Sequence, residues 1–196
     1  MTVCRMVYAC PMTMTKTVET AHLTASYADT FRGIMMTATL AQCEQASVWY
    51  RDAEEVAEEV ARNLSTSLDV GASIVAAFSP RERWSTNVAK AISFSLGNKP
   101  AGLQNNLKMA EASLTLAFDA LNGLKTNAFA RAIAGDSDAV VIDVWMCRAA
   151  MLDTDSPNVG QYRMLSDAIR IVAREFGLTP RTVQALIWII IRGGAA

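Results

Sequence analysis

The chain has 196 residues, 52% of them hydrophobic, so it is long and apolar enough to bury one sizeable core. The net charge of −1 excludes a uniformly basic protein. The charge is unevenly distributed, because residues 1–78 carry 5 Lys/Arg against 9 Asp/Glu, whereas residues 79–196 carry 13 against 10. Because the longest uncharged apolar run, Val183–Ile191, is too short to span a bilayer and no signal-peptide core precedes the domain, we expect a soluble, cytoplasmic protein.

Residues 1–40 are rich in Met and Thr, and we expect them to form an N-terminal arm whose first ~15 residues are loosely attached. His22 is the only histidine and lies in this arm. A lone histidine is more often a surface or packing residue than a general base, so we set aside Ser-His-Asp and Cys-His chemistry. Residues 41–196 should form one helical domain.

Apolar residues recur at helical spacing through most of this domain, and no stretch alternates at period 2 for long enough to form a sheet. The fold is therefore predicted to be all-α. A cluster of glutamates at positions 54, 55, 58 and 59 is typical of a solvated helix face rather than a metal site. The predicted helices cover residues 42–64, 71–78, 82–96, 103–120, 144–151, 159–176 and 180–192.

The stretch 121–148 has the most informative pattern in the chain. A turn containing Gly123 leads into a helix at Lys125, the helix breaks at Gly135, and Asp143 follows the apolar run Ala139–Ile142. A carboxylate after four apolar residues is costly to bury unless it caps a helix, pairs with a cation or takes part in a reaction. Asp143 as the N-cap of the next helix is the structural alternative to a catalytic role.

The sequence Leu-Asn-Gly-Leu-Lys-Thr at 121–126, followed after a helix by Val-Ile-Asp-Val-Trp-Met-Cys-Arg, resembles the core of the helix-hairpin-helix (HhH-GPD) DNA glycosylase superfamily. That family has L-P-G-V-G-x-K-T and then V-D-T-H-x-x-R, with 18 residues between the lysine and the aspartate. Here 143 − 125 is also 18, and the arginine five positions later corresponds to Arg148. The resemblance covers roughly residues 70–192. It implies a compact multi-helix glycosylase fold in which Lys125 is the nucleophile and Asp143 assists it.

The resemblance also implies a DNA-binding surface. Ser79 and Arg81 correspond to the segment that inserts into the DNA gap left by a flipped base, although the family usually has Gln or Asn where Arg81 stands. Alternatively, Ser79-Pro80 simply starts the next helix. The hairpin residues that would meet a DNA phosphate are Asn122, Gly123, Leu124 and Thr126, in a turn two residues shorter than the family's.

Two further positions complete the implied DNA contacts. Trp145 stands where the family usually has His, and it would either stack on a base or pack in the core. Arg148 would hold the strand. The net charge of +3 in residues 79–196 is compatible with a DNA partner and equally with ordinary surface charge.

The cysteines indicate no cofactor. Cys4, Cys10, Cys43 and Cys147 include no C-x-x-C pair, so neither a zinc site nor a disulfide framework is predicted. No cysteine follows Cys147, which excludes the four-cysteine iron–sulfur cluster of many relatives. The stripe of Gln184, Trp188 and Arg192 makes the chain similar to short phage-encoded members of the superfamily. If the protein is phage-encoded, its expected location is the cytoplasm of the host cell.

The sequence thus predicts a monomeric DNA glycosylase, with or without AP-lyase activity, that excises a damaged or modified base from double- or single-stranded DNA. Two alternatives remain open. One is a catalytically silent DNA-binding module in which Lys125 touches only phosphate. The other is a glycosidic-bond enzyme acting on modified nucleotides in phage DNA hypermodification.

Overall fold

The computed structural model describes residues 11–194, and side chains from residue 16 onward. Within this range all regular structure is helical and no strand is present, which confirms the all-α prediction. The loose attachment expected for the first ~15 residues concerns mainly residues outside the described range. The helices are α1 (Pro11–Met35), α2 (Leu40–Leu64), α3 (Leu68–Phe78), α4 (Trp84–Ser95), α5 (Gln104–Leu116), the 3-10 helix η1 (Ala117–Ala120), α6 (Leu124–Ile133), α7 (Val144–Ala149), α8 (Val159–Phe176) and α9 (Pro180–Arg192).

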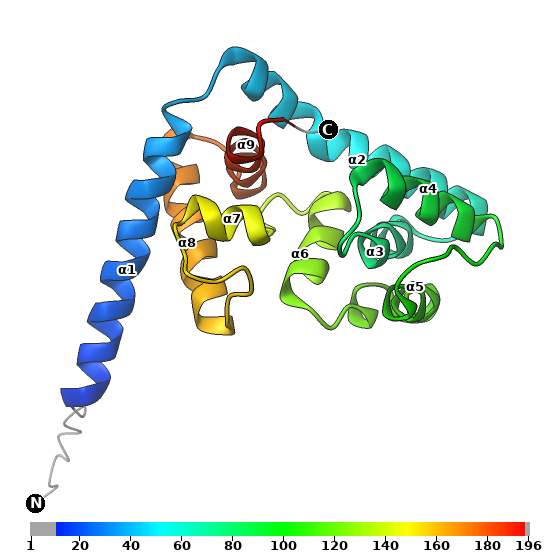
Figure 1. The fold of residues 1–196 in the computed structure, drawn as a ribbon, viewed down its shortest axis with the longest axis horizontal. Coiled ribbons are helices and arrows are strands. Elements are labelled where there is room, and N and C mark those ends of the chain that lie inside the picture. The colour runs from blue at the N-terminus through cyan, green and yellow to red at the C-terminus, as the bar shows by residue number, and fades with distance from the viewer. Residues whose placement is uncertain (1–10, 195–196) are drawn as a thin grey trace, which may run out of the picture.

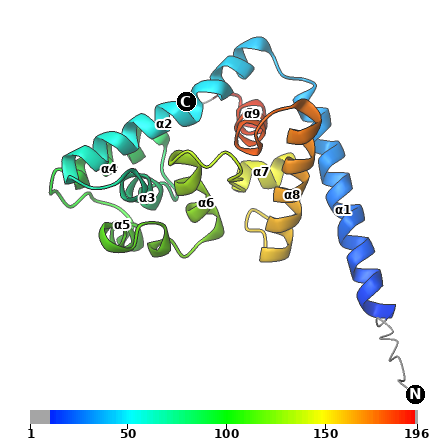
Figure 2. The same cartoon turned by 180° about the vertical axis from the view of Figure 1, so that it is seen from behind.

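The helices form two groups that meet at α6 (Figure 1). Helices α3, α4 and α5 pack together on one side, and α1, α7, α8 and α9 pack on the other. The long α2 runs along one edge of the molecule and contacts α3, α4, α6 and α9, so it joins the two groups. The N-terminal part of α1 projects away from the body in both views (Figures 1 and 2). The junction of the two groups is where the candidate site lies.

Local sequence signals explain where most helices begin. Thr39 and Gln42 form a reciprocal capping box at the start of α2, and Asn158 and Gln161 form another at the start of α8. Thr179 caps α9 with Pro180 at its first position, as the sequence predicts. The predicted bounds of helices 159–176 and 180–192 agree with α8 and α9.

The other helix bounds differ from the predictions. Helix α2 begins two residues earlier than expected, and α4 covers Trp84–Ser95 instead of 82–96. The helix expected over 71–78 begins at Leu68, because Ser67 accepts a hydrogen bond from the backbone N–H of Val70. The helix expected over 103–120 breaks after Leu116, where Ala117 has a φ of 47° and opens η1. The helix expected over 144–151 ends at Ala149.

Ser79-Pro80 does not start a helix, so that interpretation was wrong. Helix α4 begins only at Trp84, and residues 79–83 form a turn after α3. Arg81 has a φ of 63°, in the left-handed region that L-residues other than Asn and Asp rarely adopt. Such local strain is found most often at binding and catalytic sites, where the surrounding structure maintains it.

The expected N-terminal arm divides into two parts in the structure. His22 is exposed, whereas Phe31 and Met35 are buried in the core that α1 shares with α8. The guanidinium of Arg32 forms two hydrogen bonds of 2.8 Å with the carboxylate of Glu175 on α8. Residues 28–35 are therefore attached to the helical domain.

Close packing of α2 against α3 depends on Gly71. A Cβ at this position would lie 2.2 Å from the carbonyl oxygen of Ala57 on α2. Every residue of α3 from Val70 to Phe78 is buried, so the helix cannot shift without disturbing the core. The contact fixes α2, which carries part of the candidate site, relative to α3.

Replacing Gly71 with alanine is expected to destabilise the protein by about 1–3 kcal/mol, because backbone atoms must move to admit the methyl group. Chemical denaturation would measure the free energy of unfolding. Gly33 on α1 is a matched control, since nothing lies within 4 Å of its Cβ position and its φ is not left-handed. Gly33→Ala should instead stabilise by up to about 1 kcal/mol. Equal effects of the two substitutions would contradict the proposed close contact.

Candidate functional site

A pocket of about 310 Å³ opens where the two groups of helices meet. All four tryptophans of the chain line it, although they come from four different helices. Its volume lies at the lower end of the roughly 300–1,000 Å³ typical of small-molecule sites. The lining residues are Trp49, Tyr50, Ser79, Arg81, Glu82, Trp84, Asn87, Lys125, Phe129, Val141, Asp143, Val144, Trp145, Gln184, Ala185, Trp188 and Arg192.

Aromatic rings form the walls of this pocket. The Trp49 ring has its centroid 5.3 Å from the rings of both Trp84 and Trp188, in tilted arrangements. Phe129 meets the edges of Trp84 and Tyr50, at centroid distances of 6.4 and 6.5 Å. Rings held by one another in this way present rigid apolar faces, on which a planar ligand would stack.

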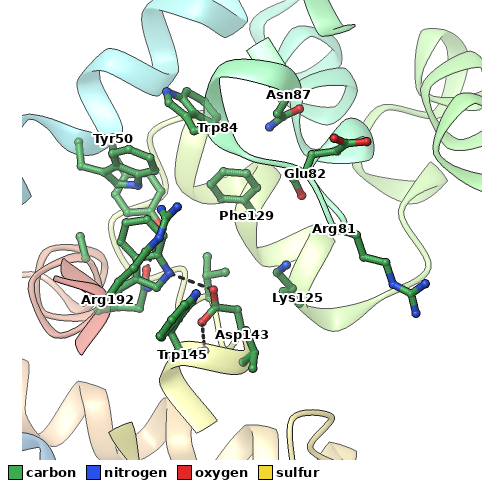
Figure 3. A pocket seen from close by; sticks show the side chains of 17 residues that line it. Tyr50, Arg81, Glu82, Trp84, Asn87, Lys125, Phe129, Asp143, Trp145 and Arg192 are labelled. Atoms are coloured by element: carbon green, nitrogen blue, oxygen red, sulfur yellow. Dashed lines mark hydrogen bonds between the residues drawn. The ribbon is translucent and has the colours of Figure 1, made fainter. Parts of the chain in front are cut away.

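Lys125 lies at the second position of α6 and is partly buried. Its amine forms no hydrogen bond or ion pair with any residue that the structure describes. Lys125 and Asp143 project toward the same space, below Phe129 in the view of Figure 3. The predicted lysine and aspartate are thus brought into one pocket by the starts of two different helices, without an ion pair within 4 Å joining them.

Asp143 is the N-cap of α7. Its Oδ1 accepts hydrogen bonds from the backbone N–H groups of Trp145 and Met146, at 3.0 and 3.1 Å. Its Oδ2 accepts a hydrogen bond of 3.0 Å from the indole N–H of Trp188 (Figure 3). The capping interpretation is therefore correct, and the same carboxylate also faces the pocket.

The segment before Asp143 is fixed from behind by Tyr162 on α8. The Tyr162 hydroxyl donates to the carbonyl of Val140 at 2.9 Å and accepts from the N–H of Ile142 at 3.2 Å. Residues 139–142 form no helix or strand, so these bonds replace the partners that regular structure would supply. Burial raises the pKa of Tyr162 to about 12, which keeps its hydroxyl protonated and able to donate at neutral pH.

Replacing Tyr162 with phenylalanine should cost about 1–3 kcal/mol of folding free energy, because a buried N–H and a buried C=O both lose their partner. Thermal or urea denaturation would show the loss. Tyr27, which is only partly buried on α1, provides a matched Tyr→Phe control that should change stability by less than about 0.5 kcal/mol. A Tyr162→Phe variant as stable as the wild type would exclude Tyr162 as the anchor of this segment.

The turn after α3 supplies one rim of the pocket. Arg81 is exposed and extends away from the pocket interior in Figure 3. Glu82, next to it, is held by an ion pair with Lys90 in which both side chains are largely buried. Because Lys90 neutralises Glu82, the cations Lys125, Arg81 and Arg192 outweigh the remaining carboxylate, Asp143.

Two buried polar atoms of pocket-lining residues have no partner. They are the Oγ of Ser79 and the Oδ1 of Asn87. Among the described side chains, these two are the buried N or O atoms that form no hydrogen bond. Most buried polar groups in folded proteins are hydrogen-bonded, because leaving one unpaired costs free energy. Both exceptions belong to residues that line the pocket.

The sequence-predicted site residues fall into three sets. Lys125, Asp143, Ser79, Arg81 and Trp145 line the pocket. The hairpin residues Asn122, Gly123 and Leu124 line a separate hollow of about 460 Å³ between α6 and α8.

Thr126 is buried and lines neither cavity. Arg148 is exposed, lies 3.5 Å from Asp155, and covers the Trp145 ring at 4.8 Å from its centroid. Arg148 therefore contacts the site only through the Trp145 ring. Trp145 itself is partly buried and lines the pocket, so it is not enclosed in the core.

Several pocket residues were not predicted from the sequence. Gln184, Trp188 and Arg192 stand one turn apart on α9, and this spacing was the available signal. The guanidinium of Arg192 covers the Trp188 ring at 4.6 Å. Buried Gln184 accepts a hydrogen bond of 2.8 Å from Tyr50. No local pattern indicates that Trp49, Trp84, Asn87 and Phe129 converge on the same place.

Other classes of site have little support in the described residues. No group of three or more His, Cys, Asp or Glu side chains there is placed to hold a metal ion. Cys147, behind Asp143, is buried, and burial together with the Asp143 charge raises the pKa of its thiol to about 11, which disfavours the reactive thiolate. Between residues 11 and 194, no helix is long and apolar enough to cross a membrane.

In a comparison with known protein families, residues 12–195 match the model of DUF7178, a family of unknown function. The chain belongs to this family. No curated protein and no solved structure matches the chain. The DUF7178 match covers every element that forms the pocket, from α2 to α9.

Proposed function

We propose that the protein is a DNA glycosylase of the helix-hairpin-helix type, which takes a flipped base into the aromatic pocket and uses Lys125 as its nucleophile. The observation that carries this proposal is the presence of Lys125 and Asp143 together in one aromatic-lined pocket, with the lysine amine unpaired. The sequence resemblance implied this pair of residues. The pocket around them forms only where α6, α7 and α9 come together.

The shape of the pocket suits an extruded base. Enzymes that act on a base in a duplex must remove it from the stack and bind it between aromatic or apolar side chains. The rings of Trp49, Trp84 and Trp188 supply such surfaces, and the exposed Arg81 lies at the rim, where the DNA backbone would pass. A guanidinium at this place would pair with phosphate or fill the gap in the stack.

The chemistry follows from the two polar groups. After Lys125 gives up its ammonium proton, its amine forms a bond to the sugar C1′ while the C1′–N bond to the base breaks. The base leaves with the bonding electrons and takes up a proton. The C1′–O4′ bond then breaks, O4′ takes up a proton and stays on the opened sugar, and a C1′=N bond forms, which gives a Schiff base on Lys125. The Asp143 carboxylate stabilises positive charge on the sugar and receives the proton that the lysine loses.

An excision assay tests this function. Duplex and single-stranded oligonucleotides carrying a panel of damaged and modified bases are incubated with the protein, and alkali then cleaves any abasic site. Strand cleavage at one class of base is expected. Tight binding with no product from the whole panel would overturn the proposal in favour of a silent base reader. Release of base from modified mononucleotides alone would overturn it in favour of a nucleotide-processing enzyme.

A further inference from the structure

Asn87 is a polar residue with no structural reason to stand where it does. It lies in the interior of α4 with only 2% of its surface exposed. Asparagine is a poorer helix former than leucine, and burying its amide costs free energy unless the amide is hydrogen-bonded. Its backbone N–H already bonds to the carbonyl of Arg83 at 2.9 Å, so the side chain is not needed to cap the helix.

Asn87 is one of the residues that line the pocket, and its amide nitrogen is the end nearer Phe129 in Figure 3. It lies on the pocket wall between Trp84 and Glu82 in Figure 3. Its Oδ1 has no partner, and Glu82 is already engaged by Lys90. The other unpartnered buried oxygen, Oγ, belongs to Ser79, which lines the same pocket from the end of α3.

We propose that Asn87, together with Ser79, determines which base the pocket accepts by hydrogen-bonding to the base's Watson–Crick edge. This inference rests on the proposed function. An asparagine amide offers an acceptor and a donor side by side in one plane, which matches the neighbouring donor and acceptor of a nucleobase edge. The Ser79 hydroxyl can donate or accept, so it accommodates a third polar atom of the ligand.

The aromatic walls could not provide this selection. Stacking on tryptophan is tolerant of base identity, because every base has a π-face. A buried amide that remains unpaired with the wrong base instead penalises that base. The pocket therefore combines tryptophan rings that stack on any base with polar groups of Asn87 and Ser79 that distinguish one base from another.

The first arm of the test measures stability without ligand. Asn87→Leu preserves approximate size and removes the unpaired oxygen, so its melting temperature should equal or exceed that of the wild type. Asn106 is a matched control, since it is also buried in a helix but donates to the carbonyl of Pro80 at 3.4 Å. Asn106→Leu should lower the melting temperature. A comparable loss in Asn87→Leu would overturn the proposal by showing that the amide is structural.

The second arm measures binding. The probes are short duplexes with a central A, C, G or T, or one of the damaged and modified bases of the excision assay, opposite a tetrahydrofuran abasic analogue. Tryptophan fluorescence reports occupancy, because all four tryptophans line the pocket. The wild type should prefer one base. Asn87→Leu should weaken binding of that base about 10- to 100-fold and leave the others within about threefold. Ser79→Ala should act in the same direction with unchanged melting temperature.

The possible failures are distinguishable. Unchanged base preference in both variants would overturn the role of Asn87 and Ser79 while leaving base binding intact. If none of these duplexes changes the fluorescence of the wild type, base binding itself is contradicted, and this inference fails with the proposed function.

Discussion

Replacing Lys125 with alanine is expected to abolish base excision, lowering turnover on the order of 10³-fold or more, while the protein remains folded. The amine has no hydrogen-bond or ion-pair partner among the described residues, so removing it breaks no such contact, and alanine is favourable in a helix. The free energy of unfolding should change by less than about 1 kcal/mol. Excision kinetics and thermal denaturation measure the two quantities on the same preparations.

Lys125→Arg separates the nucleophile from a simple phosphate contact. Arginine keeps the positive charge but remains protonated, so it cannot attack C1′. A silent DNA-binding module would retain its affinity and behaviour with arginine. We expect Lys125→Arg to bind DNA and to be as inactive as alanine. Lys108→Ala, at an exposed position of α5, is the control and should retain full turnover. Excision by Lys125→Arg at the wild-type rate would exclude the nucleophile assignment.

Replacing Asp143 with asparagine should lower turnover by about 10²-fold or more, because an amide neither stabilises positive charge nor accepts a proton from Lys125. If capping were its only contact, asparagine would cost about 1 kcal/mol or less. The hydrogen bond from Trp188 changes this expectation. An amide that keeps the cap presents its NH₂ group to the indole N–H, so the stability loss should rise to about 1–3 kcal/mol.

A second substitution separates these two effects. Trp188→Phe keeps an aromatic ring in the pocket and removes the N–H that conflicts with the amide. In that background Asp143→Asn should cost about 1 kcal/mol or less, and turnover should still fall by about 10²-fold. Recovery of turnover in the double variant, relative to Trp188→Phe alone, would show that Asp143 acts only by supporting the fold.

Much of the fold is predictable because the relevant interactions are local. The capping signals at Thr179-Pro180 and Asn158 lie within one turn of the helices they start, so the bounds of α8 and α9 can be read from the chain. The break at Ala117 and the turn at Arg81 are different. Both use a left-handed backbone at residues that do not favour it, and tertiary packing rather than local sequence maintains them.

The candidate site shows the same division. Lys125 and Asp143 could be predicted because a known spacing places each at the start of a helix, and Asp143 is confirmed as an N-cap. Asn87 and Trp49 could not, because each looks like an ordinary helix residue until α2, α4 and α9 meet. An unpaired buried amide can be recognised only once its surroundings are known.

Borohydride trapping followed by peptide mapping tests the central claim most directly. The protein is incubated with duplex DNA that carries an abasic site, the Schiff base is reduced, and mass spectrometry locates the modified residue. The adduct is expected on Lys125 alone, and Lys125→Ala should give none. An adduct on Lys16, Lys90, Lys99 or Lys108, or trapping that survives Lys125→Ala, would contradict the account.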